Sequence, residues 1–537
     1  MIFKKIVFDF INNNKKLIYS YITVSSLVEI IKVIVLSYYY SKIMKDVEKF
    51  NENILNIMFV WVALCVLYVI KTSLETPLYS DILFYVRNTL YKKYIKHNYY
   101  NFNDVNTSTD VIQIFEVART IRDAFYFICQ HIIPTIILSG TINIYFLVKY
   151  TNIGIINIIS NIVNYLIIKY FSDEVIILSN NRQQNTIQII SKLQESFGNM
   201  MDIFLNGKDD NMIQKSLLLE QNYAIIHKNE FTKISNFINL LKINNYIFSL
   251  ISIYILYKSY DNEDFMNGLL IFTFYISVLQ ELSENIPKFI TMIGNIDCME
   301  DILGPKLEDN EIIDNGIMPH INGMIQFQNI NFSYMKDKII LNSFNMNIKM
   351  GERVAIIAPS GSGKTTIMKL LLKFYKPQQG VILLDNININ DINTKYVRKH
   401  INYINQKTIL FNDTIINNMK YGNEKSDAEI FDLLQQYDLL YLFNNDINEL
   451  QKIVEINGTN ISMGIQKIIF LVRGILKTDC SIYVFDEPLT SLDMNTRKKV
   501  MKMINNIVRD KTTIIITHDI EINSIVHRVI NLGTNNN

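Results

Sequence analysis

Long apolar stretches in the first 300 residues restrict the possible folds of this chain more than any other feature of its sequence. Residues 125–148 contain no Asp, Glu, Lys or Arg, and residues 54–70 are likewise uncharged. A helix needs roughly 17 to 25 predominantly apolar residues to cross a lipid bilayer. The sequence therefore predicts six membrane-spanning helices, at residues 17–40, 54–70, 125–148, 150–168, 243–257 and 265–280.

The last two predicted spans are short, and a second interpretation of them stays open. Lys242 and Lys258 bracket residues 243–257, and such long cationic side chains can extend from a helix end to the membrane surface. Alternatively, these two segments form a pair of buried helices in a protein core. Two long polar segments with helical patterning, residues 71–124 and 169–242, complete this half of the chain.

Lysine and arginine residues near the ends of the spans predict the orientation of the chain. Four lysines precede the first span, and Lys71, Arg87 and further lysines follow the second, whereas the loops assigned to the other side are short. Positive charge favours the cytoplasmic side of a membrane. We therefore expect an integral, multi-pass membrane protein with both termini and the long polar segments in the cytoplasm; the sequence leaves the membrane itself open.

A few polar residues interrupt the apolar stretches. Glu29 and Lys32 lie one helical turn apart in the first span, and charges inside a membrane often mark a functional site. In an equally good interpretation, the two charges only neutralise each other, or their side chains extend to the membrane surface. His131 and Asn143 in the third span are weaker candidates for lining a transport pathway.

The composition excludes several classes of protein. The 52 Lys and Arg residues nearly balance the 51 Asp and Glu residues, so no strong positive field is available to bind nucleic acid. Charged residues make up only 19% of the chain and hydrophobic ones 49%, which is typical of a protein that lies partly in lipid rather than of a disordered chain. The four cysteines do not predict a disulfide framework.

The pattern of residues in the sequence changes after about residue 300. Gly304, Pro305, Gly316 and Pro319 predict a linker over residues 301–323 between a membrane domain, residues 1–300, and a second domain, residues 324–537. In the second domain, short β-branched runs alternate with helical patterns. This alternation predicts an α/β fold with a largely parallel sheet.

A phosphate-binding loop is the strongest motif of the second domain. A mostly apolar strand, residues 353–358, is followed by Ala-Pro-Ser-Gly-Ser-Gly-Lys-Thr at 358–365 and by a helical segment. Small residues let the backbone N–H groups surround a phosphate, Lys364 supplies a positive charge, and the Thr365 hydroxyl is suited to bind Mg²⁺. Ala358 stands where the strict pattern has Gly. The motif predicts binding of a nucleotide with Mg²⁺.

Two further strands end in residues suited to phosphate chemistry. The buried run before Asp486 ends in that residue and Glu487, of which the first suits Mg²⁺ binding and the second suits activation of an attacking water. Residues 513–517 form another predicted strand that ends at His518, which could reach a terminal phosphate. Ser462 and Gly464 open a further predicted helix, and they form a second candidate anion site.

Taken together, the spans and motifs resemble an ABC transporter half-unit, in which a six-span permease of the type IV exporter fold is fused to one ATP-binding domain. The resemblance covers nearly the whole chain. It implies that Tyr334, in Phe-Ser-Tyr at 332–334, stacks on adenine, and that Gln406 senses Mg²⁺ and water and contacts the permease. It also places Asp493 in the D-loop and makes His518 the switch histidine. Residues 86–91 and 101–104 resemble the first intracellular loop and its coupling helix.

The motifs and the resemblance together define the candidate site residues. The catalytic candidates are Glu487, His518 and Gln406, and the Mg²⁺ candidates are Thr365, Gln406 and Asp486. The candidates for binding ATP are Tyr334, Ala358, Pro359, Ser360, Gly361, Ser362, Gly363, Lys364, Thr365, Thr366, Ser462, Gly464 and Asp493.

The chain departs from the family in its signature motif. Where the family has Leu-Ser-Gly-Gly-Gln, residues 461–465 read Ile-Ser-Met-Gly-Ile, so Met463 and Ile465 replace a Gly and the Gln. The sequence leaves open whether these two replacements slow ATP turnover. The favoured interpretation is an ATP-driven exporter that acts as a dimer of half-units. Its cofactors are ATP and Mg²⁺, and its partners are the lipid membrane and a second half-unit, in a homodimer or a heterodimer. Its substrate is unknown. The alternative is an ATP-binding membrane sensor or scaffold with weak transport. A soluble P-loop kinase or a DNA-repair ATPase does not fit the six spans.

Overall fold

The fold is known from a computed structural model, which describes residues 2–45, 50–100, 107–260, 262–308, 314–335, 338–357, 359, 362–406, 409–455 and 458–532. The chain divides into two compact units. The first comprises Met1–Asn98 and Asn103–Asn310, and the second comprises Tyr99–Phe102 and Glu311–Asn537. The predicted coupling helix at 101–104 lies outside the described residues.

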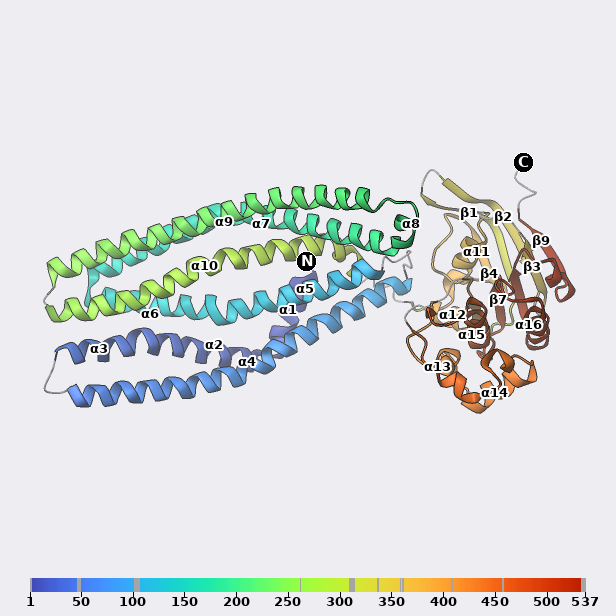
Figure 1. The fold of residues 1–537 in the computed structure, drawn as a ribbon, viewed down its shortest axis with the longest axis horizontal. Helices are drawn as coiled ribbons and strands as arrows, with labels where there is room; N and C mark the ends of the chain where they lie inside the picture. The colour runs from blue at the N-terminus through green and yellow to red at the C-terminus, as the bar shows by residue number, and fades with distance from the viewer. Residues whose placement is uncertain are drawn as a thin grey trace. The chain divides into compact units, whose positions relative to one another are not determined.

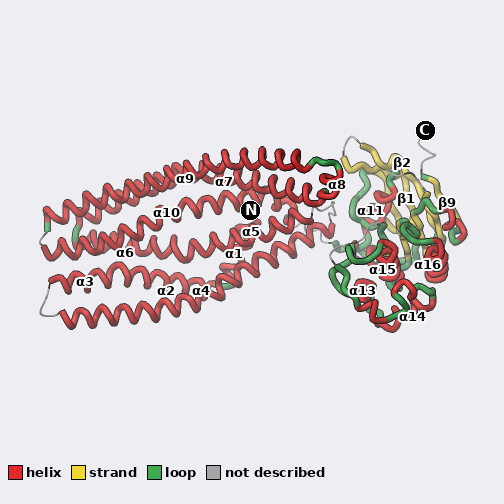
Figure 2. The backbone as a smooth tube through the Cα atoms, viewed as in Figure 1, coloured by secondary structure: helices red, strands yellow, loops and turns green. Residues whose placement is uncertain are grey.

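The described residues of the first unit form helices joined by short turns, and four of these helices have 46 to 51 residues (Figures 1 and 2). Two of its long apolar segments, the first and the third, are not uniform α-helices, because each is interrupted by a π-helical turn. The helices are α1 (Ile2–Asn13), α2 (Lys15–Ile30), η1 (Ile31–Val35, π), α3 (Leu36–Lys45), α4 (Phe50–Tyr100), α5 (Thr107–Phe127), η2 (Ile128–Ile132, π), α6 (Ile133–Lys149), α7 (Thr151–Gly198), α8 (Met200–Leu205), α9 (Asp209–Ser259) and α10 (Asn262–Leu307).

Six helical segments of the described residues are long and apolar enough to cross a membrane. Each overlaps one of the six predicted spans, including the two short ones within α9 and α10. Only 22–33% of the most apolar window of each segment is buried, so most of the apolar side chains face outward. A helix at the centre of a soluble core would be buried all round, whereas outward-facing apolar side chains suit contact with lipid. The six-span prediction is confirmed at this level.

The predicted linker differs from the structure at both of its ends. Helix α10 continues through Gly304 and Pro305 to Leu307, because Leu303 and Leu307 are fully buried and Lys306 forms a 2.6 Å ion pair with the carboxylate of Asp110. At the other end, the backbone N–H groups of residues 322–324 donate hydrogen bonds to Asp385. That segment is therefore part of the second unit.

The second unit contains two sheets. One is antiparallel, with strand order β2-β1-β4-β5, and the other is parallel, with strand order β6-β7-β8-β3-β9. The parallel sheet was predicted, and the antiparallel one was not. The strands are β1 (Ile325–Met335), β2 (Lys338–Ile348), β3 (Arg353–Ile357), β4 (Gln379–Leu384), β5 (Ile387–Asn388), β6 (Ile401–Ile404), β7 (Ile482–Asp486), β8 (Thr512–Ile516) and β9 (Arg528–Asn531).

The parallel sheet lies between two hydrophobic cores. Val354 and Ile356 of β3 face one core, whereas Ala355 between them faces the other. Alternate side chains of a strand point to opposite faces of a sheet, so a strand covered on both faces is apolar throughout. The α-helices of this unit are α11 (Lys364–Leu371), α12 (Thr394–His400), α13 (Ile415–Lys420), α14 (Asp427–Gln436), α15 (Met463–Ile475) and α16 (Met494–Ile507), and its 3-10 helices are η3 (Ile389–Asp391), η4 (Leu440–Phe443), η5 (Ile447–Gln451) and η7 (Ile520–Ser524).

Candidate functional site

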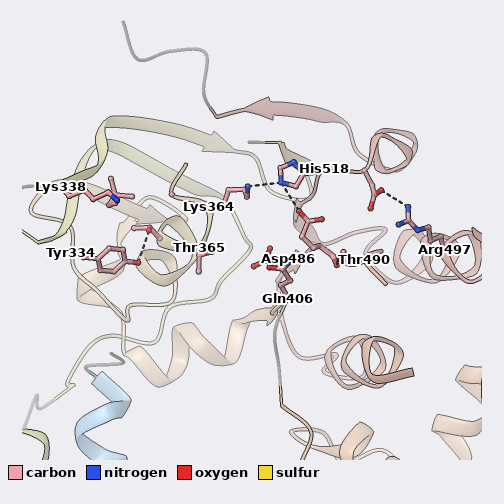
Figure 3. Close-up of a pocket in the computed structure, with 14 residues that line it drawn as sticks. Tyr334, Lys338, Lys364, Thr365, Gln406, Asp486, Thr490, Arg497 and His518 are labelled. Carbon is pink, nitrogen blue, oxygen red and sulfur yellow. Dashed lines mark hydrogen bonds and ion pairs between the residues drawn. The ribbon is translucent and has the colours of Figure 1, made fainter. Parts of the chain in front are cut away.

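A cavity of about 650 Å³ in the second unit gathers most of the predicted site residues (Figure 3). Strands β7, β8 and β3 are neighbours in the parallel sheet, so their carboxyl ends meet at one edge. The loops that follow such ends commonly bind ligands. Nine predicted residues line the cavity: Tyr334, Gly363, Lys364, Thr365, Thr366, Gln406, Asp486, Glu487 and His518.

The phosphate-binding loop leads from β3 into α11. Gly363 caps the start of α11 with a φ of 89°, a backbone conformation that glycine adopts without strain. Lys364 donates a hydrogen bond from Nζ to the carbonyl oxygen of Pro359 at 3.0 Å. Its Nζ also lies 3.4 Å from Nε2 of His518. The lysine charge is thus held at the mouth of the loop, close to the predicted switch histidine. Ala358, Ser360 and Gly361 lie outside the described residues.

The acidic pair ends β7 in a largely buried position. The Tyr403 hydroxyl donates a hydrogen bond to Oδ2 of Asp486 at 2.9 Å, which orients that carboxylate. Glu487 has a φ of 48°, an uncommon value for a residue with a side chain, and its N–H donates to the carbonyl of Ile516 at 2.8 Å. This backbone turn aims the Glu487 carboxylate toward His518, whose Nε2 lies 3.6 Å from Oε1. Strained backbone of this kind is frequent at functional sites.

Burial dominates the electrostatics of the two acids. It raises the pKa of Asp486, which the Tyr403 hydrogen bond and the charge of Lys467 oppose. Burial also raises the pKa of Glu487, against the lowering effect of His518. A carboxylate with a raised pKa is a better proton acceptor near neutral pH than an exposed one. The environment of Glu487 therefore suits a general base.

Lys467 is a buried cation behind the acidic pair. It lies on α15, is only 6% exposed, and donates from Nζ to the main-chain oxygen of Asp486 at 3.3 Å. Burial lowers the pKa of this ammonium group to about 8, although the Asp486 and Glu487 carboxylates act in the opposite direction. The lysine therefore places a positive charge beneath the two carboxylates, with part of that charge lost above neutral pH.

Replacing Lys467 with Met is expected to change how the stability of the chain depends on pH. Between pH 8 and 10.5 the unfolded lysine binds a proton that the folded one has lost, so wild-type stability should rise relative to Lys467→Met through this window. The rise should reach roughly 2 kcal/mol by about pH 10. Thermal unfolding of both full-length proteins in detergent measures it. Lys502→Met, which removes an exposed lysine of α16, should show no such rise, and a pH-independent difference for Lys467→Met would contradict the assignment.

Tyr334 occupies the other end of the cavity. Its hydroxyl lies 3.1 Å from Oγ1 of Thr366, and its ring packs edge-on against Phe332 and Tyr375, with centroid distances of 5.0 and 5.2 Å. The ring remains 45% exposed. It is therefore fixed in place by its neighbours and still presents surface to a ligand, as stacking on a base requires.

The Tyr334→Ala chain is expected to bind ATP more weakly and inorganic triphosphate equally well. Stacking is worth about 0.5–1.5 kcal/mol beyond area burial for aromatic pairs, which corresponds to roughly a 2- to 12-fold rise in the ATP dissociation constant. Tyr334→Phe keeps the ring and loses the bond to Thr366, so it should stay close to wild type. Equal losses for ATP and triphosphate in the alanine variant, measured by calorimetry, would count against stacking.

Several predicted residues do not line this cavity. Ser462 caps α15, its hydroxyl accepting a hydrogen bond from the N–H of Ile465, and Gly464 lies next to the main chain of Ser491. Asp493 caps α16 by accepting hydrogen bonds from the N–H groups of residues 495 and 496. Pro359 and Ser362 belong to the loop without lining the cavity. Within one chain, the signature residues therefore do not line the cavity that contains the phosphate-binding loop.

The cavity also includes residues that the motifs missed. Lys338, Thr490, Arg497 and Asp519 line it, and Arg497 forms a 3.0 Å ion pair with Asp519. Tyr403 and Lys467 support Asp486 from behind. The signal available for Lys467 was weak: it is a single lysine that comes directly before the apolar run of residues 468–472.

The oxygen atoms at one end of the cavity fit Mg²⁺. Thr365, Gln406 and Asp486 line the cavity and offer hydroxyl, amide and carboxylate oxygens, the hard ligands that this ion prefers. Among the described residues, no group of three or more His, Cys, Asp or Glu side chains is arranged to hold a metal. Mg²⁺ usually binds through one or two protein oxygens together with substrate phosphates. The residues present therefore fit an ion that binds with a nucleotide.

Comparison with known proteins shows what the second unit is similar to. Residues 341–490 match the family described as ABC transporter. The mitochondrial iron-sulfur clusters transporter ATM1 of Candida albicans is 38% identical over 199 residues, which are 36% of this chain and 26% of that protein. The ATP-dependent lipid A-core flippase of Neisseria meningitidis serogroup B is 34% identical over 200 residues, 37% of this chain and 32% of that protein. The chain thus matches about a quarter to a third of the length of these relatives.

A solved structure extends the likeness to the whole fold. The structure of a bacterial Atm1-family ABC exporter with ATP bound has a TM-score of 0.85 to this chain. The match covers 97% of this chain and 94% of that one, at 19% sequence identity. At this identity the likeness concerns the fold, and it includes the helical unit that the family match at 341–490 does not reach.

Proposed function

We propose that this chain, which carries an ABC transporter domain and has the fold of an ABC exporter half-unit, is one half of an ATP-driven membrane exporter. The observation that carries the proposal is the cavity in which Lys364, Asp486, Glu487 and His518 meet, in a chain whose other unit has six helices of membrane-spanning length. The relatives named above are transporters. No observation favours the alternative of a membrane sensor, which the altered signature suggested.

The reaction is the hydrolysis of ATP. Water attacks the γ-phosphorus, the bond to the β-γ bridging oxygen breaks, and ADP leaves. Glu487 accepts a proton from the water, while Lys364 and His518 stabilise the charge that develops on the phosphate oxygens. Mg²⁺, held by Thr365, Gln406 and Asp486, would neutralise charge on the phosphates. Tyr334 holds the base of the nucleotide.

The working form is a dimer, either of two copies or with a related half-unit. Ser462 and the N–H groups at the start of α15 form an anion site that does not line the cavity of its own chain. In the dimer this site faces the phosphate of the partner's nucleotide. Met463 is 72% exposed, so this substitution in the signature is accessible to a partner. Closure of the dimer around ATP drives the transport step, and hydrolysis reverses it.

The membrane orientation follows the charge distribution. Both termini, the ATP-binding unit and the polar extensions of α4, α5, α7 and α9 lie in the cytoplasm, consistent with the lysines of the first 16 residues.

Reconstitution tests the proposal directly. The full-length protein in phosphatidylcholine vesicles should hydrolyse ATP and should trap nucleotide in the presence of vanadate. It should also move some solute in a screen of fluorescent organic ions and lipids, and the Glu487→Gln protein, processed in parallel, should move none. Hydrolysis without movement of any solute would favour the sensor.

A further inference from the structure

The two turns that carry Glu487 and His518 lie beyond the last residues that the parallel sheet pairs. Strands β7 and β8 pair in register as far as Asp486 and Ile516. Glu487 directly follows the first of these strands, and His518 lies in the turn after the second. The side chain of His518 is 51% exposed, so packing alone does not fix its ring. The separation of 3.6 Å between Nε2 of His518 and Oε1 of Glu487 therefore depends on the contacts that the two turns make.

Arg497, in the first turn of α16, contacts both of these turns (Figure 3). Its Nε donates a hydrogen bond to the carbonyl oxygen of Leu492 at 3.1 Å, and its Nη1 donates to Oδ1 of Asp519 at 3.0 Å. Leu492 belongs to the segment between Glu487 and α16, and Asp519 directly follows His518. One guanidinium group therefore bridges the turn that carries the proposed base and the turn that carries the histidine.

The carboxylate of Asp519 is available to Arg497 because it does not cap the helix that follows it. Asp519 is the N-cap residue of η7, but in the part of the chain that the structure describes its side chain makes no capping bond. Asp446, the N-cap residue of η5, does make such a bond. The N–H of Asp519 donates to Oγ1 of the buried residue Thr517 at 2.9 Å. The backbone of Asp519 is thus anchored to the end of β8 while its side chain binds Arg497.

The other turn has a backbone that needs support from its surroundings. Glu487 and Ser491 have φ values of 48° and 66°, which are uncommon for residues with a side chain. Such conformations persist only where the surrounding structure holds them. The hydroxyl of Thr490 donates a hydrogen bond to the carbonyl oxygen of Glu487 at 2.7 Å. The bond from Arg497 to Leu492 is a second contact that holds this segment in place.

The ion pair between Arg497 and Asp519 is suited to act as such a bridge. The two side chains are only 24% and 25% exposed, so water screens their attraction less than it would in a fully exposed pair. A hydrogen bond between charged groups is also roughly twice as strong as one between neutral groups. Arginine suits this position because its rigid, planar group carries several N–H donors, whereas lysine carries a single nitrogen. Both residues line the nucleotide cavity, so a displacement of either would change its wall.

We propose that Arg497 is a positioning residue for ATP hydrolysis, which through Asp519 and Leu492 holds His518 and Glu487 at the separation that the reaction requires. It acts through these neighbours and not by touching the nucleotide. The assignment rests on the proposed function, because it concerns the hydrolysis of ATP in this cavity. Loss of the ion pair should therefore slow the chemical step and leave the binding of ATP unchanged.

Three variants of the full-length protein in phosphatidylcholine vesicles test this assignment. Asp519→Asn keeps the size of the side chain and removes its charge, and its ATP turnover should fall about tenfold, since a misplacement of about 1 Å can cost on the order of 10²-fold. Its dissociation constant for ATP, measured by displacement of a fluorescent ATP analogue, should stay within about twofold of wild type, because the pair lies on the opposite side of the cavity from Tyr334 (Figure 3). Arg497→Met should lose at least as much turnover. The double variant should be no slower than Arg497→Met alone, because residues that act through one shared contact are not additive.

Arg528 supplies a matched control in the same unit. Its Nε donates to Oε1 of Glu352 at 2.9 Å, and its Nη2 donates to the carbonyl oxygen of Asn347 at 2.6 Å. It therefore also bridges one carboxylate and one main-chain carbonyl group, but it does not line the nucleotide cavity. Arg528→Met should keep turnover within about twofold of wild type, as for most surface substitutions.

The outcomes separate positioning from other roles of the arginine. Turnover of Asp519→Asn within twofold of wild type would overturn the proposal, as would a double variant slowed by the product of the two single effects. Weaker ATP binding by Arg497→Met, with unchanged turnover at saturating ATP, would mean that the arginine touches the nucleotide and would also overturn it. Because Asp519→Asn is informative on its own, an Arg497→Met chain that fails to fold leaves the test intact. A wild-type protein that does not hydrolyse ATP would overturn the proposed function together with this assignment, whereas an active wild type with insensitive variants would overturn this assignment alone.

Discussion

The Glu487→Gln protein should bind ATP with near-normal affinity and hydrolyse it at a rate reduced on the order of 10²–10⁴-fold, the usual contribution of general acid–base catalysis. The carboxylate is largely buried, it faces His518, and burial raises its pKa, so it is well suited to take a proton from water. Glutamine preserves the size of the side chain and removes only this capacity. Steady-state release of phosphate by the full-length protein in vesicles measures the loss.

A matched control separates the loss of the base from the loss of a negative charge. Glu521 is an exposed acid in the 3-10 turn η7, which follows His518 by only two residues. Glu521→Gln removes one charge from the same region without touching the cavity, and we expect its turnover to remain within about twofold of wild type, as for most surface substitutions. Near-normal hydrolysis by Glu487→Gln would remove Glu487 from the role of base.

Mixing two inactive chains should restore one working nucleotide site. Lys364→Ala removes the phosphate-binding charge, and Ser462→Arg places a bulky cation at the start of α15, so each variant alone should trap almost no nucleotide. In a mixed dimer, one site contains both defects. The other site combines the intact loop of the Ser462→Arg chain with the intact signature of the Lys364→Ala chain.

Trapping of radiolabelled nucleotide with vanadate measures this rescue. Differently tagged chains purified as heterodimers should recover trapping to about half the wild-type level, because one of two sites is whole. Steady turnover is a poorer measure, since coupling between the sites can keep it low. If proven heterodimers trap no more nucleotide than either homodimer, Ser462 does not serve the partner's site.

Motifs that follow parallel strands were predictable from the sequence for a physical reason. Strands β3, β7 and β8 are mostly apolar runs covered on both faces, and the polar residues at or shortly after the end of each run leave the sheet at the same edge. Lys364, Asp486 and His518 could therefore be placed together before any coordinates were known.

Other features depend on contacts that no local pattern contains. Tyr403 reaches Asp486 because β6 pairs with β7 in register, and Lys467 reaches it because α15 packs on that sheet. The end of α10 was predicted too early, because Gly304 and Pro305 disfavour helix while the burial of Leu303 and Leu307 stabilises it. The bridge from Arg497 to Leu492 and Asp519 likewise depends on the position of α16 beside the ends of β7 and β8.

The complete burial of β7 and β8 affects the order in which the protein unfolds and loses nucleotide binding when it is heated. Every residue of both strands is shielded from solvent, and the two cores meet on their opposite faces. Backbone amides in such strands exchange with solvent hydrogen mainly when the whole cooperative unit opens. The position of Asp486 and Glu487 is therefore as durable as the unit itself. Heat should not abolish nucleotide binding by loosening the acidic pair first; binding and folded structure should disappear together.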